Sequence, residues 1–144
     1  MSELLLIVSL AGRRVAMDAA TIESVVEIEG ITPVPRAAYH VAGLSALRSR
    51  VLTVIDCFAS LELGCSARSG TRDAVVAVLD GHPYALLVDG VEDVVEHDGT
   101  ILPLKTALGS GWQRVASGTV EADGDLLLLV DARALVAGPL AEAA

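Results

Sequence analysis

The chain has 144 residues and a formal net charge of -9, with 10 basic against 19 acidic side chains. This balance argues against a nucleic-acid partner and against docking on an anionic membrane surface, because both need a basic face. Hydrophobic residues make up 53% of the chain but aromatic residues only 3%, so we expect an aliphatic core. The many β-branched residues in short runs favour sheets.

The N-terminal part reads as a strand, a turn and a strand. Residues 4–10 are apolar, an Ala-Gly pair follows, and apolar and polar positions alternate in residues 13–18. Residues 19–24 fit either a helical turn or a strand, and residues 25–28 read as strand again. Two nearby prolines then exclude a regular element.

A hairpin is the strongest local feature of the first half. Residues 37–41 fit a short helical turn, and two apolar runs follow at 43–47 and 51–55. The polar residues 48–50 between them predict a tight turn joining antiparallel strands. Such a tip holds a guanidinium exposed on short, stiff flanks, which suits Arg48 to a contact with another protein. Spacing alone favours a plainer interpretation, in which the two arginines of this turn only add solubility.

The second half repeats this pattern of short strands. Residues 57–63 predict a turn of helix, and the small, polar residues 64–71 are the best boundary between two halves. Strands are expected at 74–79 and 84–88, joined by an Asp-Gly turn that is a strong hairpin signal. Residues 91–96 alternate in part and read as a further strand.

The C-terminal part ends in a hairpin and a capped helix. Residues 101–112 look irregular, and strands are expected at 115–120 and 126–130. Asp131 is expected to cap a short helix at 132–137, which a Gly-Pro pair then stops.

These elements add up to about ten short strands with little helix. The sequence therefore predicts an all-β fold, either a pair of small barrels or a sandwich. We expect one domain over residues 1–138, with a subdomain boundary near 64–72 and a tail at 139–144. Closing each sheet into a barrel would remove long edges that a chain so rich in Val and Leu cannot safely expose.

The sequence shows no signal for a membrane or for secretion. No apolar run approaches the roughly 20 residues that span a bilayer, and the N-terminus lacks a basic signal-peptide region. Cys57 and Cys65 form no metal-ligand cluster with the histidines. We therefore expect a cytoplasmic protein with reduced thiols and no direct membrane insertion.

No catalytic motif is recognisable either. The chain lacks the G-x-S-x-G, H-E-x-x-H, P-loop and Rossmann patterns. We interpret His82 and His97 as solvated turn residues and Cys57 as a buried structural thiol. A wet strand face, rather than a cation site, explains the acidic residues Glu92, Asp93, Glu96 and Asp98. These interpretations favour a binding module without enzyme activity, cofactor or metal.

Four segments form a specific combination. They are LLLIVSLAGRRVAMDAATIESVVE at 4–27, ALRS at 46–49, VLTVID at 51–56 and LLVDGVEDVV at 86–95. The combination resembles the CheW family of bacterial chemotaxis adaptors and the related regulatory domain of the histidine kinase CheA. The family has an "NLRG" turn, a following "V.P(I/V)(V/I)D" strand and a "(I/L)VDxVxDV" segment at these places. The resemblance covers about residues 4–136.

The resemblance implies a fold and a role. The fold is two small five-stranded SH3-like β-barrels packed together, with a groove between them and a short C-terminal helix. The role is that of a non-enzymatic adaptor, which bridges the cytoplasmic tip of a chemoreceptor coiled coil to the regulatory domain of CheA.

Matched positions then give candidate protein-binding residues. Arg48 is implied in the receptor and kinase contact at the hairpin. Candidates to line the groove for an amphipathic receptor helix are Leu47, Val54 and Val88. Candidates for the kinase-facing edge of the first barrel are Val26 and Ile28.

The hairpin departs from the family pattern at three positions. Ala46 stands where the family has asparagine, Ser49 where it has glycine, and Thr53 where it has proline. If the glycine position takes a positive φ, a serine there costs about 1 kcal/mol or moves the turn.

Two other functions stay open at this point. The aliphatic interior and the few aromatic residues are compatible with a small-ligand-binding β-barrel. A hydrolase that uses Cys57 with a distant histidine is the third hypothesis, and a buried, inert thiol would exclude it.

Overall fold

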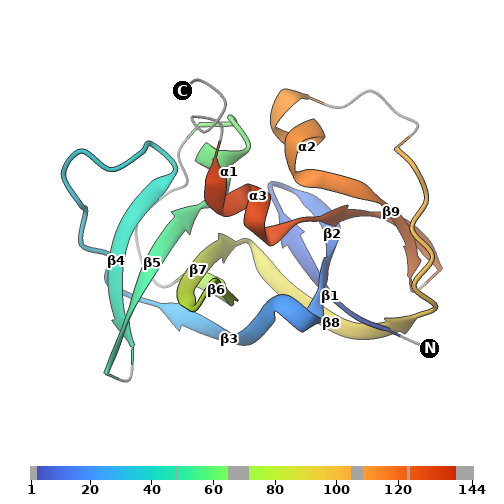
Figure 1. Ribbon diagram of the computed structural model, residues 1–144, viewed down its shortest axis with the longest axis horizontal. Helices are drawn as coiled ribbons and strands as arrows, with labels where there is room; N and C mark the ends of the chain where they lie inside the picture. The colour runs from blue at the N-terminus through green and yellow to red at the C-terminus, as the bar shows by residue number, and fades with distance from the viewer. Residues whose placement is uncertain (1–2, 48, 65–71, 105–108, 123, 139–144) are drawn as a thin grey trace.

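Ten strands and three short α-helices make up the part of the chain that the structure describes. The computed structural model describes residues 3–47, 49–64, 72–104, 109–122 and 124–138. The strands form two five-stranded sheets that lie side by side, with the helices gathered along one side of their junction (Figure 1). The predicted all-β fold is therefore confirmed.

Each sheet has one parallel strand pair and is otherwise antiparallel. Sheet A has the order β8-β1-β2-β10-β9, and sheet B has the order β3-β6-β7-β5-β4. The strands of sheet A are β1 (Glu3–Leu10), β2 (Arg13–Asp18), β8 (Gly90–His97), β9 (Ala116–Ala122) and β10 (Asp125–Val130). The strands of sheet B are β3 (Ile22–Ile28), β4 (Val41–Leu47), β5 (Arg50–Asp56), β6 (Arg72–Leu79) and β7 (His82–Val88). The parallel pairs are β10 with β2 and β5 with β7.

Both sheets combine strands from the two halves of the chain. Sheet A takes β1 and β2 from the first half and β8, β9 and β10 from the second, whereas sheet B takes β3, β4 and β5 from the first half and β6 and β7 from the second. Each half runs through a hairpin, a third strand that joins the other sheet, a second hairpin and a short helix. Neither half contains a complete sheet, so the two halves depend on each other.

The predicted hairpins are confirmed, and so is the predicted C-terminal helix. The turn between β4 and β5 is tight, with Leu47 paired to Arg50. The side chain of Asp131 accepts a hydrogen bond from the backbone N–H of Arg133 at 2.9 Å and caps α3 (Ala132–Ala137). Short helices also follow β5, as α1 (Cys57–Ser60), and β2, as the 3-10 turn η1 (Ala19–Thr21).

Two predicted stretches differ from the structure. Residues 37–41 contain no helix but a turn, closed by a 2.9 Å hydrogen bond from the backbone N–H of Val41, where β4 begins, to the carbonyl of Ala38. The stretch 101–112, expected to be irregular, contains the start of α2 (Ser110–Val115). The boundary stretch 65–71 and the tail 139–144 lie outside the described residues. None of the described helices has the length and the apolar character needed to traverse a membrane.

The central strands are buried on both faces. On β1, Leu5 packs in a cluster inside sheet A, whereas its neighbour Leu6 packs in a second cluster that both sheets share. On β6, Val76 packs in a third cluster inside sheet B, whereas Val75 packs in the shared one. Successive side chains on a strand point to opposite faces, so each sheet curls around its own interior and packs its other face against its neighbour.

The helices fasten the two sheets together at the junction. Arg114 of α2 donates hydrogen bonds to the backbone carbonyls of Ala134 (2.5 Å) and Ser60 (2.6 Å), which belong to α3 and α1. The hydroxyl of Ser60 donates to the carbonyl of Leu135 at 2.7 Å. A Cβ at Gly111 would clash with the backbone of Leu61, so only glycine allows this close approach. One arginine thus joins the helices that follow β5 and β10.

We expect the shared cluster to dominate stability. Leu86 is fully buried in it, whereas Leu126 on β10 is 61% exposed. Leu86→Ala should lower the free energy of unfolding by about 2–5 kcal/mol, because the loss of buried methyl groups leaves a cavity. Leu126→Ala, the matched control, should change it by less than about 0.5 kcal/mol. Urea unfolding followed by circular dichroism measures both; equal effects would show that the shared cluster is not what holds the sheets.

Candidate protein-binding site

Three of the predicted binding residues lie together on the two edge strands of sheet B, although one of them, Ile28, is only 2% exposed and packs in the interior of that sheet. Val26 and Ile28 belong to β3 and Leu47 to β4, the two edge strands of that sheet. Between these strands lie three adjoining hollows of about 230, 340 and 230 Å³, and Leu47 lines all of them. We call this region, from Glu23 to Gly30 and from Ser45 to Leu47, the β3–β4 seam.

The other two apolar candidates are buried. Val54 is fully buried in the interior of sheet B, and Val88 is 2% exposed in the cluster that the sheets share. Their side chains pack the cores and are not on a surface groove in this structure. The sequence did not reveal this, because both faces of β5 and β7 carry apolar residues.

The tip of the β4–β5 hairpin carries strained backbone next to an ion pair. Arg48 lies outside the described residues. Ser49 has a φ of +70°, the left-handed conformation expected for the glycine that the family has there. Arg50 donates to the carboxylate of Glu23 at 2.5 Å, so this pair crosses the end of the seam.

A second apolar surface lies where the shared cluster reaches the outside. Leu4 (49% exposed) and Val94 (51%) are on neighbouring strands, with Leu6 paired to Val94, so they share the face that packs against sheet B. Val25 on β3 is also exposed (45%), but it lines a seam hollow together with Val26 and Leu47 and so belongs to the β3–β4 seam. We call Leu4 and Val94, on the face of sheet A that turns toward sheet B, the inter-sheet patch. The sequence did not predict these residues, because a local pattern cannot show that a residue on the core-facing side of a strand lies past the edge of the core and is exposed to solvent.

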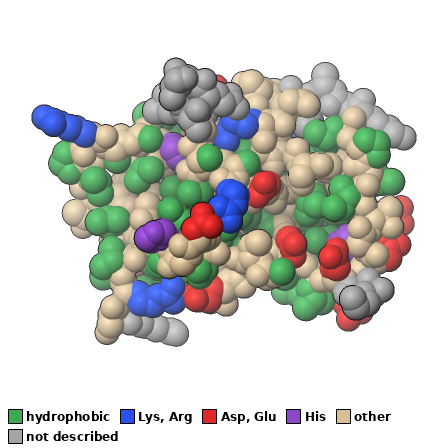
Figure 2. Space-filling view, in the orientation of Figure 1, with side chains coloured by type: hydrophobic (Ala, Val, Ile, Leu, Met, Phe, Trp, Pro, Cys, Tyr) green, Lys and Arg blue, Asp and Glu red, His purple; other side chains and the backbone are tan. Residues whose placement is uncertain are grey.

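The charges of the molecule are unevenly distributed. Acidic side chains are more prominent at the sheet A end of the face in Figure 2 than at the sheet B end. At that end, a hollow of about 360 Å³ is lined by Glu96, Asp98, Glu121 and His97. Hydrogen bonds from the backbone and side chain of Thr100 lower the pKa of Asp98.

One histidine prediction needs correction. The side chain of His97 is only 5% exposed, and its Nδ1 accepts a hydrogen bond from the backbone N–H of Gly99 at 3.0 Å. His97 is therefore a half-buried residue whose side chain is largely withdrawn from solvent and fixes the turn after β8, which corrects the solvated interpretation. His82 is exposed, as predicted.

The acidic strand face is wet, as expected, and partly ion-paired. Glu92, Asp93 and Glu96 are exposed on β8. Arg14 donates to Glu92 and to Asp125, each at 2.8 Å, and these contacts raise the pKa of Arg14. Among the described residues, no group of His, Cys, Asp and Glu is arranged to hold a metal ion.

Cys57 is unsuited to be a nucleophile. Its side chain is fully buried in the shared cluster, and burial, followed by the charge of Asp56, raises the pKa of the thiol far above its usual range. Because the thiolate is the reactive form, the hydrolase hypothesis is excluded for this residue. Cys65 lies outside the described residues.

Comparisons with known sequences agree on one family. The family model for the CheW-like domain matches residues 4–139. "Chemotaxis protein CheW" of Rhizobium meliloti is 30% identical over 114 residues, 76% of this chain and 74% of that protein. "Probable chemotaxis protein CheW" of Rhizobium etli is 30% identical over 127 residues, 85% and 82%. "Chemotaxis protein CheW" of Thermotoga maritima is 29% identical over 116 residues, 81% and 76%.

A solved structure shows the same fold. The scaffolding protein TtCheW from Thermoanaerobacter tengcongensis superposes with a TM-score of 0.76 at 22% identity, covering 91% of this chain and 90% of that one. The expected fold of two five-stranded SH3-like barrels is therefore confirmed, although the described strands leave each sheet open between its edges.

The strain at Ser49 gives a testable consequence. Ser49→Gly should raise the free energy of unfolding by about 0.5–1 kcal/mol, because glycine adopts a positive φ without a clash of its Cβ. Ser24→Gly, at an exposed position of β3, is the matched control and should lower it by a similar amount. Chemical unfolding of both variants measures this; destabilisation by Ser49→Gly would contradict the strain.

Burial of Cys57 predicts a pH dependence of stability. In the folded protein the thiol stays neutral, whereas in the unfolded chain it ionises above about pH 8.5. Above that pH, ionisation lowers the free energy of the unfolded state alone. The contribution of the neutral Cys57 thiol to the free energy of unfolding is therefore complete below about pH 8.5 and decreases as the pH rises. At pH 10 the loss from this group should be about 2 kcal/mol.

Unfolding curves between pH 7 and pH 10 measure this loss. Cys57→Ala lacks the group and should show a shallower decline, while every other titrating group stays the same. Equal slopes in the two proteins would show that the thiol is not held neutral by the fold.

Proposed function

The chain belongs to the CheW-like domain family of chemotaxis scaffolds, and we propose that it couples chemoreceptors to the histidine kinase CheA. The observation that carries this proposal is the presence of two distinct apolar surfaces, the inter-sheet patch and the β3–β4 seam, on different parts of one rigid fold. A protein that bridges two others needs two such surfaces.

The inter-sheet patch suits a helix of the receptor tip. Leu4 and Val94 present exposed aliphatic side chains on neighbouring strands of sheet A, on the face that turns toward sheet B. An amphipathic helix binds through a few such anchors along one face. We therefore assign the patch to the receptor, in place of the buried Val54 and Val88.

The β3–β4 seam suits the regulatory domain of the kinase. Its half-buried apolar side chains are Val26, a predicted edge residue, and Leu47, a residue first expected in the receptor groove; Ile28 lines the same region but is buried at 2% exposure. Arg48 adjoins the seam in sequence, directly after Leu47. A charge at the rim fixes register and speeds encounter more than it adds affinity.

Contacts of this size imply modest affinity for each partner. Signalling interfaces often bury less than about 1,200 Å² in total, and micromolar affinity corresponds to about -8 kcal/mol. In an array that holds many copies together, avidity then strengthens the binding of each copy to its partners.

No observation favours the small-ligand alternative. The hollows described above lie between edge strands at the surface, whereas the interiors of both sheets are filled by Leu, Ile, Val and Ala side chains. A scaffold role also requires no catalytic group.

Substitutions in the two surfaces should separate the two partners. Val26→Glu should weaken binding to the regulatory domain of CheA at least tenfold, because it places a charge in the apolar seam, and should leave receptor binding unchanged. Val94→Glu should do the reverse. Titration calorimetry with the regulatory domain and with a receptor-tip fragment measures both affinities.

Arg48→Glu should weaken binding to these partners while leaving the fold intact, because Arg48 is expected in the receptor and kinase contact.

Circular dichroism controls for folding, and Val78→Glu, at another partly exposed valine, controls for added charge. Absence of binding to the regulatory domain at about 100 μM, with folded protein, would contradict the adaptor function. Loss of both interactions in each variant would contradict the assignment of separate surfaces.

A further inference from the structure

The last turn of α3 is held by side chains from three other parts of the chain. The carbonyls of residues 134–136 each accept a hydrogen bond from α2, α1 or the segment before β4. The pairs are Arg114 with Ala134 (2.5 Å), Ser60 with Leu135 (2.7 Å) and His40 with Val136 (2.7 Å). A helix leaves its last carbonyls without partners of its own, so these side chains fix the end of α3 against the rest of the molecule.

His40 is enclosed although its ring is polar. It is 4% exposed, and the ring lies so close to Gly138 that a Cβ there would come within 2.2 Å of it. The carbonyl of Val136 can only accept, so Nε2 of the ring carries the proton and Nδ1 does not. Nδ1 is buried and has no hydrogen-bond partner. The site thus fits the neutral ring and offers no acceptor for a second proton.

A second proton would also create a charge that nothing near the ring balances. The titratable and charged side chains on the surrounding elements are Arg36 and Tyr39 before β4, Asp56 and Cys57 where β5 meets α1, Arg114 on α2, and Arg133, paired with Asp80, on α3. The Asp56 carboxylate accepts from the N–H of Ala59, and the histidine ion pairs within the described ranges are both on His97. A helix C-terminus favours a positive charge, and Arg114 already supplies one at α3.

We propose that His40 is a proton-sensitive latch for α3, in which the neutral ring holds the end of the helix and protonation at Nδ1 releases it. In the released state water accepts the hydrogen bond from Nδ1–H, so that state binds the second proton more readily. Acid therefore shifts the equilibrium toward release. The latch is closed where imidazole is neutral and opens as the pH falls through about 6.5 and below. This device does not depend on which partners the two apolar surfaces bind.

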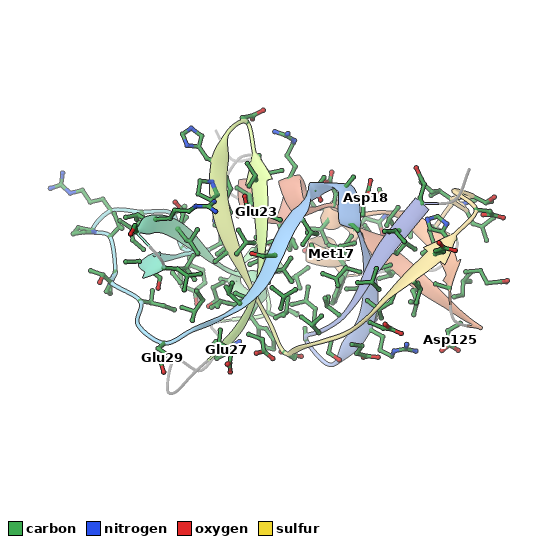
Figure 3. The ribbon with its side chains drawn as sticks, turned by 90° about the horizontal axis from the view of Figure 1, so that it is seen from below. Met17, Asp18, Glu23, Glu27, Glu29 and Asp125 are labelled. Atoms are coloured by element: carbon green, nitrogen blue, oxygen red, sulfur yellow. The ribbon has the colours of Figure 1, made fainter. Side chains whose placement is uncertain are left out.

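Release of α3 would loosen the centre of the molecule. Ala132 and Leu135 of this helix, 5% and 0% exposed, pack in the cluster that the two sheets share. Met17 belongs to the same cluster, and Figure 3 shows it between the sheets. Local opening of one short helix costs less free energy than global unfolding. A proton can thus change the rigidity of the junction while the strands stay paired.

The two other histidines lack this arrangement and serve as internal controls. His82 is exposed, so water solvates its charge. Nε2 of His97 lies 3.8 Å from the carboxylate of Glu3, which can balance a second proton there.

Hydrogen exchange at two pH values tests the latch. After correction for intrinsic exchange rates, the opening equilibrium constant of amides 134–138 should be at least about fivefold larger at pH 5.5 than at pH 7.5. His40→Gln keeps an N–H donor for the carbonyl of Val136 but does not titrate, so its constant should change less than about twofold. His82→Gln should behave like the unmodified protein. Equal pH dependence in the unmodified protein and His40→Gln would overturn the proposal.

An NMR titration of the His40 ring in the unmodified protein decides the question even if His40→Gln does not fold. Protonation of the ring should coincide with the loss of protection in residues 134–138. A ring that is protonated while these amides stay protected would overturn the latch, and so would a ring that stays neutral while they open.

Gly138→Ala should open the latch without acid, because the added Cβ collides with the His40 ring. Its opening constant for amides 134–138 at pH 7.5 should rise at least tenfold and lose most of its pH dependence. Gly12→Ala has a similar φ, +77° against +71°, and nothing within 4 Å of the added Cβ, so it controls for backbone strain. Equal protection of the α3 end in the two variants would overturn the contact on which the latch rests.

Discussion

Burial of both faces of the central strands is the constraint on which the rest of this structure depends. Leu5 and Leu6 on β1, and Val75 and Val76 on β6, are neighbours in sequence that fill different clusters. Each such side chain contributes about 1.5–3 kcal/mol relative to an exposed one. The sheets cannot separate without exposing the shared cluster to water, so the two barrels act as one rigid body. A rigid body is what a scaffold with two binding surfaces requires.

The exchange of strands between the halves makes this cluster possible. β3 follows β2 directly but pairs with β6, and β8 follows β7 directly but pairs with β1. The chain therefore crosses the junction twice through short connections, and the strand after the second crossing carries the exposed Val94. The inter-sheet patch is a consequence of this topology. The bonds of Arg114 to the carbonyls of Ser60 and Ala134 hold the same junction from the helix side.

Local features such as turns and helix caps could be predicted from the sequence, whereas the face of a strand on which a residue is exposed could not. The β4–β5 hairpin and the cap of α3 at Asp131 depend on residues close together in the chain, and both are confirmed. The family motif raised a positive φ at Ser49 as a condition, and the structure has it. Val54 and Val88, by contrast, belong to strands that are apolar on both faces, so alternation does not distinguish a core residue from a surface one. The burial of His97 depends on how β1, β8 and the turn after β8 come together, which no local pattern shows.

The open seam of sheet B follows from how the chain connects its two edge strands. β3 and β4 are consecutive in sequence, but Pro33 and Pro35 lie between them and exclude a tight hairpin. Within the long connection, Thr32 pairs with Leu44 of β4. Glycine is required at the preceding position, Gly43, because a Cβ there would collide with the carbonyl of Thr32. The Thr32–Leu44 bridge is the contact that partly closes the barrel near the middle of β4, while no backbone pairing is described between β3 and Ser45–Leu47. An isolated protein normally protects such an edge with charge, and Glu27, Glu29 and Asp73 supply it here.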